Sequence, residues 1–453
     1  MFDVKQSSAI DEAILKSLAE EFRADPRNHL AQDAVTRHPI HEVALNHERA
    51  IAFDHSFSNQ LPTHKVTAQE RSGRCWMFAG LNLLRTEAMK QLNVEDFELS
   101  QSYVMFWDKL EKANFFLESI LSTLDEDLYG RLVMFLLDHP IQDGGQWDMF
   151  ANLIKKYGVV PKSVMPETES SSNSGLMNLL VTSKLREQAS ELRQMHAAGA
   201  SAEALRERKQ AMLQVIYRML AVHLGEPPRS FDWQWRDKQD LFHRDAQITP
   251  QEFFRRYTQF NLDDWVCLIN CPTGDKPFNK LYTIDYLGNV VEGQIVRYLN
   301  VDLPTFKRAA LDALVQGGQP IWFGCDVGKR LERDLGIMDT SLYDYSLVYG
   351  ADFKAGKAQR VDYGDSMMTH AMVFTGVDLD EGGSPRKWRV ENSWGDKYGD
   401  HGYYIMSDAW FDEFMYEVAV PREFVPKELL PILETEPVHL PPWDPMGALA
   451  AAA

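Results

Sequence analysis

Four residues of this sequence have the side chains that hydrolysis by a thiol requires: Cys75, His370, Asn392 and Gln69. A thiolate is a nucleophile, and a neighbouring histidine can accept its proton and later return a proton to a leaving amine. An asparagine amide oxygen can accept the other ring N–H of the histidine, and a glutamine amide can donate to an oxyanion. These residue types therefore predict acyl chemistry, provided that the fold brings them together.

Cys75 stands where a polar, glycine-containing turn meets an apolar segment. The turn runs from Gln69 to Arg74, and the spacing of apolar residues predicts a helix over 75–90. A thiol at a helix N-terminus beside a histidine ionises more easily, because the helix dipole and an imidazolium both favour the anion. A cysteine in an apolar segment is more often a small buried hydrophobe. The position of Cys75 alone therefore leaves both interpretations open.

The surroundings of His370 and Asn392 favour the catalytic interpretation. His370 stands at the entry of a short apolar run, 371–377, which predicts a strand. A second such run, 387–391, leads directly into Asn392. Trp394 follows closely, and its indole could shield a hydrogen bond between the histidine and the asparagine from water. Two neighbouring strands would thus present the histidine and its orienting amide together.

Taken in chain order, these segments strongly resemble the papain-like cysteine peptidases. The match consists of Gln69, Cys75-Trp76, Gly144-Gly145, His370-Ala371, Asn392-Ser393-Trp394-Gly395 and Gly402-Tyr403. The resemblance implies that Cys75 is the nucleophile, that His370 is general base and then acid, and that Asn392 orients the ring. It also implies an oxyanion hole made by Gln69 and the backbone N–H of Cys75. Gly144 and Gly145 would pair with the substrate backbone, with Trp394 nearby.

One branch of that family, the bleomycin hydrolases and bacterial aminopeptidase C enzymes, is similar over essentially the whole chain. The added matches are residues 321–329 and the tail 443–450. The branch implies a homohexamer in which each C-terminal arm lies in its own active-site cleft and its carboxylate meets the α-ammonium group of a peptide. The relatives end near the position of Ala450, whereas here three alanines follow, so both Ala450 and Ala453 are candidates to carry that carboxylate.

The resemblance also shows what this chain lacks. Secreted members of the family carry a disulfide whose two positions are here Ser72 and Gln142. Both cysteines are absent, and the four cysteines of the chain are too few and too scattered for a disulfide framework. Cys267, Cys271 and Cys325 are expected to be core residues. A reducing, cytoplasmic location is therefore expected, and the N-terminus lacks the pattern of a signal peptide.

The expected fold class is α+β, a papain-like fold with a helical half around the nucleophile helix and an antiparallel β half. The separation of Cys75 and His370 greatly exceeds the ~130–150 residues of secreted members, which predicts a large helical insertion. The predicted units are an N-terminal helix and extension (1–68), the helical half (69–165), the insertion with oligomer contacts (166–260), the β half (261–420) and a proline-rich arm (421–453). Outside the helix at 8–24, the N-terminal extension is expected to be irregular as far as residue 68.

Composition limits the remaining function classes. The chain has 453 residues, 45% of them hydrophobic, and no apolar run long enough to span a membrane. Its net charge of −19 argues against nucleic acid as a partner. Neither a metal site nor a phosphate-binding loop is indicated, so no cofactor is expected. The expected function is a cysteine aminopeptidase of broad specificity, with bleomycin-type substrates included. An acyl-transferring enzyme, an endopeptidase with a displaced tail and a non-catalytic binding protein remain alternatives.

Overall fold

The computed structural model describes residues 9–448. Within this range the helical half contains four main helices around a buried centre: α5 (Cys75–Leu92), α6 (Gln101–Ser122), α7 (Arg131–Asp138) and α8 (Trp147–Tyr157). Nearly every residue of α5 down to Arg85 is buried. A helix that is apolar on all sides must be enclosed, and α5 packs against α6, α8 and the sheet. The nucleophile candidate therefore begins the central helix of the domain.

The β half is one large, mostly antiparallel sheet. Its strands in the described residues follow the order β14-β5-β6-β4-β13-β7-β10-β11-β12-β9-β8, with β1 paired to β10. Their bounds are β1 (Asn59–Gln60), β4 (Trp265–Ile269), β5 (Lys280–Ile284), β6 (Tyr298–Asn300), β7 (Ile321–Cys325), β8 (Leu331–Glu332), β9 (Ile337–Met338), β10 (His370–Leu379), β11 (Pro385–Glu391), β12 (Tyr403–Ser407), β13 (Met415–Pro421) and β14 (Val438–Leu440).

The central strands have two buried faces, which explains why their sequences are continuous apolar runs. Along β10, Ala371 and Val373 face the core that contains α5, whereas Met372 and Phe374 face a second core. That second core is closed by helices α13 (Leu303–Val315) and α16 (Asp408–Phe414). The strands expected at 371–377 and 387–391 are thus confirmed, and the short apolar runs around 265–270 and 320–325 also form strands, β4 and β7.

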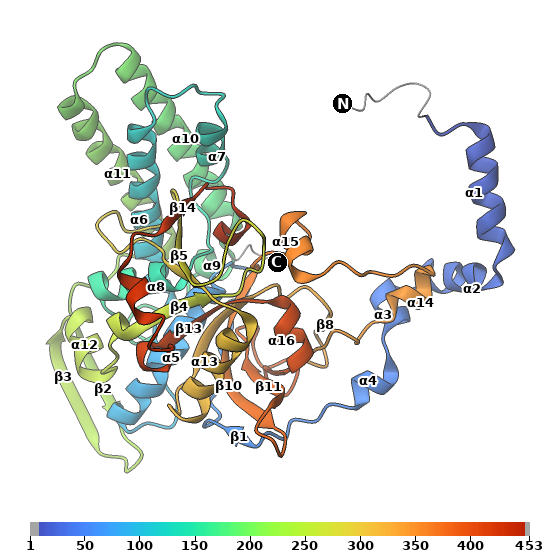
Figure 1. Cartoon of the computed structure of the whole chain (residues 1–453). Helices are drawn as coiled ribbons and strands as arrows, with labels where there is room; N and C mark the ends of the chain where they lie inside the picture. Colours follow the sequence, from blue (N-terminus) through green and yellow to red (C-terminus); the bar gives the residue numbers. More distant parts are fainter. Residues whose placement is uncertain (1–8, 449–453) are drawn as a thin grey trace.

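The inserted segment is built from α9 (Glu169–Ser172), α10 (Gly175–Ala197), α11 (Ala202–Leu224) and α12 (Pro250–Tyr257). Figure 1 shows α10 and α11 standing out from the body beside α6. The segment also contains an antiparallel hairpin, β2 (Phe231–Arg236) with β3 (Phe242–Ile248), which the expectation of a purely helical insertion missed. Its alternating burial and its aromatic Trp233 and Trp235 are typical of a half-buried strand.

The N-terminal region corrects a second expectation. Residues after 29 were expected to be irregular, yet the structure contains α2 (Pro26–Val35), α3 (Ile40–Ala44) and α4 (His47–Ile51) after α1 (Glu12–Ala24). Asp25 ends α1 and also caps α2, with Pro26 at its first position. The Asp-Pro pair is therefore a helix start as well as a stop. Figure 1 shows α1 and α2 held away from the body, with α2 beside α14 (Tyr345–Tyr349).

The segment after β13 crosses the molecule toward the junction of the two halves. Short 3-10 turns at Arg422–Phe424 and Leu430–Glu434 lead to β14, which pairs in parallel with β5. A last turn, Pro445–Gly447, follows. The remaining short helix of the β half is α15 (Lys357–Asp362). In the part of the chain that the structure describes, no helix is long and apolar enough to cross a membrane.

Candidate active site

The thiol of Cys75 lies at the first position of α5 and touches the start of β10. Its Sγ accepts the backbone N–H of Ala371 at 3.3 Å, and the residue is only 1% exposed. Arg74, the N-cap residue, makes no side-chain cap bond. The free N–H groups of the first helical turn therefore face the region of the sulfur. The fold thus places a thiol against the strand that begins with His370.

His370 and Asn392 come together from neighbouring strands. The Nε2 atom of His370 is 2.9 Å from Oδ1 of Asn392, and the same Oδ1 accepts the backbone N–H of Ser393 at 2.8 Å. The Trp394 ring lies beside the imidazole, with 4.9 Å between ring centroids. Both bonded residues are buried. The geometry leaves Nδ1 as the ring nitrogen available for proton transfer.

Burial dominates the electrostatics of this group. It raises the pKa of the Cys75 thiol to about 12, against the opposing effect of the N–H groups of Ala371, Trp76 and Cys75 itself. Burial and, to a smaller extent, the nearby Arg333 guanidinium lower the pKa of His370 to about 4, although the bond to Asn392 opposes both. The two pKa shifts favour an uncharged thiol and an uncharged imidazole. In the resting pair the proton therefore lies on the sulfur, and its transfer to His370 must accompany the attack on a substrate.

Gln69 is fixed in the loop that precedes Cys75. Its Oε1 accepts the Ser393 hydroxyl at 2.7 Å, and its Nε2 donates to the Ser72 carbonyl at 2.5 Å. Its backbone N–H also donates to the Ser393 carbonyl at 2.8 Å. An amide nitrogen carries two hydrogens, so the second one is free to meet a developing oxyanion. The loop thus links Gln69 directly to the residue after Asn392.

Gly144 and Gly145 lie against the start of α5. A Cβ added to Gly145 would lie 2.5 Å from the Trp76 ring, so only glycine permits this close approach. The Trp76 indole N–H donates to the Asp143 carbonyl at 2.7 Å. The glycine pair is therefore held beside the residue that follows the nucleophile.

The C-terminal segment reaches the same place. The Nε2 atom of Gln146 donates to the Ala448 carbonyl at 3.0 Å, immediately after the glycine pair. Upstream, Asp444 pairs with Lys276 at 2.9 Å in a buried contact, and Met446 is buried. Ala450 and Ala453, the candidates for the terminal carboxylate, lie outside the described residues.

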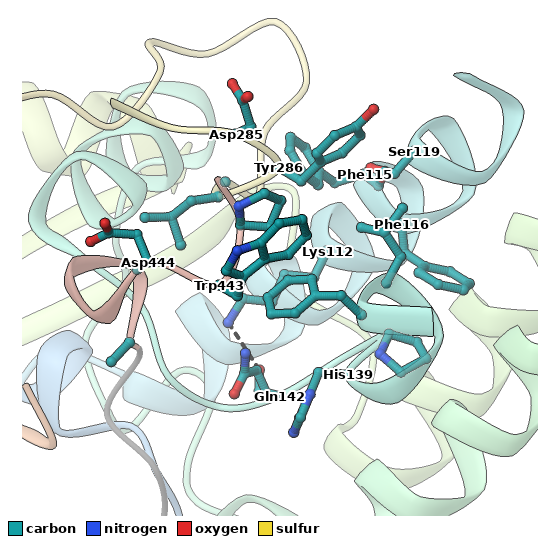
Figure 2. Close-up of a pocket in the computed structure, with 18 of the residues that line it drawn as sticks. Lys112, Phe115, Phe116, Ser119, His139, Gln142, Asp285, Tyr286, Trp443 and Asp444 are labelled. Carbon is teal, nitrogen blue, oxygen red and sulfur yellow. Dashed lines mark hydrogen bonds between the residues drawn. The ribbon is translucent and has the colours of Figure 1, made fainter. Parts of the chain in front are cut away.

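A cavity of about 420 Å³ flanks this segment (Figure 2). Figure 2 shows the Trp443 side chain projecting among Phe115, Phe116 and Tyr286, with Lys112 below it. The Trp443 ring also lies 3.8 Å from the guanidinium of Arg131. The wall of the cavity is mainly aromatic and apolar, and its lining includes residues 442–445, 447 and 448. The segment is thus seated by an aromatic anchor and a buried ion pair.

The structure brings together Cys75, His370, Asn392, Gln69 and Trp394. Sequence reasoning did not single out the buried charges nearby, which belong to Asp108, Lys109, Lys112 and Asp143. It also did not single out Arg333, whose exposed side chain lies near His370. A signal was present, because charged residues at 108, 109 and 112 stand between the aromatic pairs 106–107 and 115–116 of the same helix. Trp147, two residues after the glycine pair, is a core residue packed on Trp265 and Trp322.

Known proteins resemble this chain over nearly its full length. A family model described as the Peptidase C1-like family matches residues 9–447. Aminopeptidase C of Listeria monocytogenes is 46% identical over 436 residues, which cover 96% of this chain and 98% of that protein. Human bleomycin hydrolase is 42% identical over 453 residues, covering 98% and 99% of the two chains. The crystal structure of PepW from Lactobacillus rhamnosis HN001 has a TM-score of 0.96 at 48% identity, and covers 98% of this chain and 100% of its own.

Proposed function

We propose, from the premise that this chain belongs to the Peptidase C1-like family and is a cysteine aminopeptidase, that Cys75, His370, Asn392 and Gln69 perform its chemistry. The observation that carries the proposal is the contact of the Cys75 thiol with Ala371, one residue from a histidine that is bonded to Asn392. These contacts join the first residue of α5, the first residue of β10 and the residue after β11.

The mechanism follows from the uncharged resting pair. Nδ1 of His370 takes the thiol proton as Sγ attacks the carbonyl carbon of the first peptide bond. The resulting oxyanion accepts hydrogen bonds from the Cys75 backbone N–H and from Gln69 Nε2. His370 then donates the proton to the leaving amine, and a thioester forms. Water, deprotonated by His370, hydrolyses the thioester and releases the first residue.

Asn392 acts through the imidazole. Its Oδ1 holds Nε2–H of His370 and thereby keeps Nδ1 directed to the thiol. It also stabilises the imidazolium that forms during each half-reaction. Trp394 covers this bond and excludes water from it, which strengthens the bond in a low-dielectric surrounding.

Restriction to the N-terminal residue is proposed to come from the C-terminal arm. The arm is seated by Trp443 and by the Asp444–Lys276 pair, and it reaches Gln146 beside Gly144–Gly145. A carboxylate beyond this point, on Ala450 or Ala453, would attract an α-ammonium group in a partly desolvated cleft. The arm would also occupy the side of the cleft where the chain preceding the scissile bond would lie. Long chains could then not thread through, and only free N-termini would be processed.

A matched pair of fluorogenic peptides tests the proposal. One peptide has a free amino terminus and the other is acetylated, and both are assayed under reducing conditions with Cys75→Ala as control. Rapid, Cys75-dependent cleavage of the free peptide alone is expected. Equal cleavage of both would keep the peptidase and refute the arm's role, whereas turnover that survives Cys75→Ala would refute the nucleophile. Because the human relative is named for bleomycin, its hydrolysis is the second activity to assay.

A homohexamer in the cytoplasm is proposed as the setting. The apolar face of α1 supports self-association, since Ile14, Leu18 and Phe22 are 44%, 54% and 41% exposed and such a face needs a partner. All four cysteines are free thiols, which suits a reducing compartment. Light scattering measures the mass directly, and Leu18→Glu is expected to reduce it. A monomeric mass for the unaltered protein would refute the hexamer.

A further inference from the structure

The carboxylate of Asp143 joins the loop before the nucleophile to the glycine pair. Its Oδ2 accepts the backbone N–H of Gly73 at 2.9 Å, and Gly73 lies two residues before Cys75. The same residue directly precedes Gly144, and its carbonyl accepts the Trp76 indole N–H at 2.7 Å. One residue thus contacts the chain on both sides of Cys75.

Three further side chains also donate hydrogen bonds to this carboxylate. Its Oδ1 accepts Lys109 Nζ at 2.6 Å and the Asn178 amide at 2.8 Å. The Ser174 hydroxyl donates to Oδ2. Lys109 projects from α6, whereas Asn178 lies in α10. The central helical half and the inserted helices therefore both hold Asp143.

Lys112 performs the same task for the glycine pair. Its Nζ donates to the carbonyls of Gln142 at 2.9 Å and Gly144 at 2.6 Å, and the first of these bonds is drawn in Figure 2. Its charge is balanced by Asp108 at 2.7 Å, whose other oxygen accepts the Asn289 amide. Lys112 thus holds the two carbonyls on either side of Asp143.

All four charged side chains are buried. Exposed fractions are 0% for Asp108 and Lys109, 6% for Lys112 and 7% for Asp143. Two carboxylates and two ammonium groups cancel in formal charge. Lys109 and the hydroxyl and amide donors hold the pKa of Asp143 well below its usual range in spite of burial. The carboxylate therefore remains charged across the working pH range.

We propose that Asp143, paired with Lys109, is a positioning residue that fixes the 69–74 loop, and with it the oxyanion donors, relative to the glycine pair. The segments that it joins are those of Ser72 and Gln142, which secreted papain-like peptidases link by a disulfide. The Asp143–Lys109 ion pair and its hydrogen bonds, here called the clamp, would connect the same two segments without a disulfide. The inference rests on the proposed roles of Cys75 and Gln69.

Two double variants separate the positioning role from the charge balance. Lys109→Met with Asp143→Asn removes both charges but keeps an oxygen that can accept the Gly73 N–H. Lys109→Met with Asp143→Ala removes both charges and the acceptor. We expect the alanine pair to lower kcat by about tenfold or more relative to the asparagine pair, with KM changed by less than about threefold. Alkylation of Cys75 by iodoacetamide needs no oxyanion hole and should stay within about threefold in both.

Two further variants keep the outcome decisive. Asp143→Glu retains the charge but displaces the carboxylate by one methylene, so its kcat should also fall. This variant tests the proposal if the alanine pair does not fold. Asp339→Asn alters a buried carboxylate paired with Arg49, in a separate cluster, and should change the melting temperature without changing kcat. A kcat that is equal in all folded variants would overturn the proposal. Turnover that persists in Cys75→Ala would instead refute Cys75 as the nucleophile. That control tests the proposed function, whereas the Asp143 variants test the positioning role.

Discussion

Nε2 of His370 lies 2.9 Å from Oδ1 of Asn392, in a buried contact between the first residue of β10 and the residue that follows β11. The two strands pair antiparallel, with Val373 opposite Glu391. This pairing brings the end of β11 to the start of β10, where the imidazole and the amide meet through their hydrogen bond. The amide oxygen is also anchored by the Ser393 N–H, so the orientation of the ring is decided by the sheet.

Asn392→Ala should lower kcat by about 10- to 100-fold, because the imidazole loses the bond that sets its tautomer and direction. KM for a free-amine peptide should change little, since Asn392 acts through His370. Steady-state kinetics with that peptide measure both parameters. Asn392→Gln retains an amide and should recover part of the loss. Full activity of the alanine variant would contradict the orienting role.

Alkylation of Cys75 should depend on pH in a manner set by the uncharged resting pair. With the thiol pKa raised to about 12 and the His370 pKa lowered to about 4, little thiolate exists between pH 5 and 8. The rate of inactivation by iodoacetamide should therefore keep rising with pH through this range. A plateau between pH 5 and 8 would instead show a preformed thiolate–imidazolium pair. His370→Ala serves as the control for the contribution of the imidazole.

Gly145→Ala should disable the enzyme through a steric clash. The new Cβ would lie 2.5 Å from the rigid Trp76 ring, and relief requires movement of the residue next to the nucleophile. Overpacking of this kind costs about 1–3 kcal/mol. Thermal unfolding and kcat/KM report the two effects. Gly175→Ala, where a Cβ meets nothing within 4 Å, is the matched control and should leave both unchanged.

Removal of residues 449–453 should weaken the preference for free amino termini. A variant that stops at Ala448 keeps the seat made by Trp443 and Asp444 but loses the proposed carboxylate position. The ratio of kcat/KM for free and acetylated peptides should fall by about tenfold or more, the equivalent of about 1.4 kcal/mol for a charge pair. A variant that ends at Ala450 tells whether that residue or Ala453 carries the carboxylate. An unchanged ratio in the shortest variant would refute the anchor.

Much of the fold could be predicted because buried strands and helices leave simple patterns. The apolar runs of β4, β7, β10 and β11 and the helix after Cys75 were all evident. Helix α2 was missed because its apolar residues do not gather on one face. The hairpin β2–β3 was missed because the helices on both sides of it dominate that segment. Local patterns thus specify elements well where one face or both faces are buried.

The proposed site was partly predictable for a different reason. Cys75, His370, Asn392 and Gln69 could be singled out because their chemistry limits the residue types. The clamp around Asp143 could not, because the partners of Asp143 come from α6, the loop before α5 and α10. Lys109 and Lys112 look like ordinary helix charges in sequence. Only the tertiary structure shows that they are buried and point at one loop.

Glu417→Gln should flatten the pH dependence of stability. Glu417 is fully buried on β13, and burial, together with the neighbouring Asp148, raises its pKa to about 8 against the opposing effect of a bond to Cys267. The folded state therefore holds a proton that the unfolded chain releases near pH 4.5. This contribution is complete below pH 4.5 and is lost as the pH rises toward 8.

The melting temperature of the unaltered protein should accordingly fall between pH 5 and pH 8, by the equivalent of a few kcal/mol at most. Glutamine carries no charge at any pH, so the melting temperature of Glu417→Gln should vary less over the same interval. Asp408→Asn, at a partly buried ion pair with Lys307, provides a control that should retain the slope. Parallel pH profiles for Glu417→Gln and the unaltered protein would show that Glu417 is ionised in the folded state.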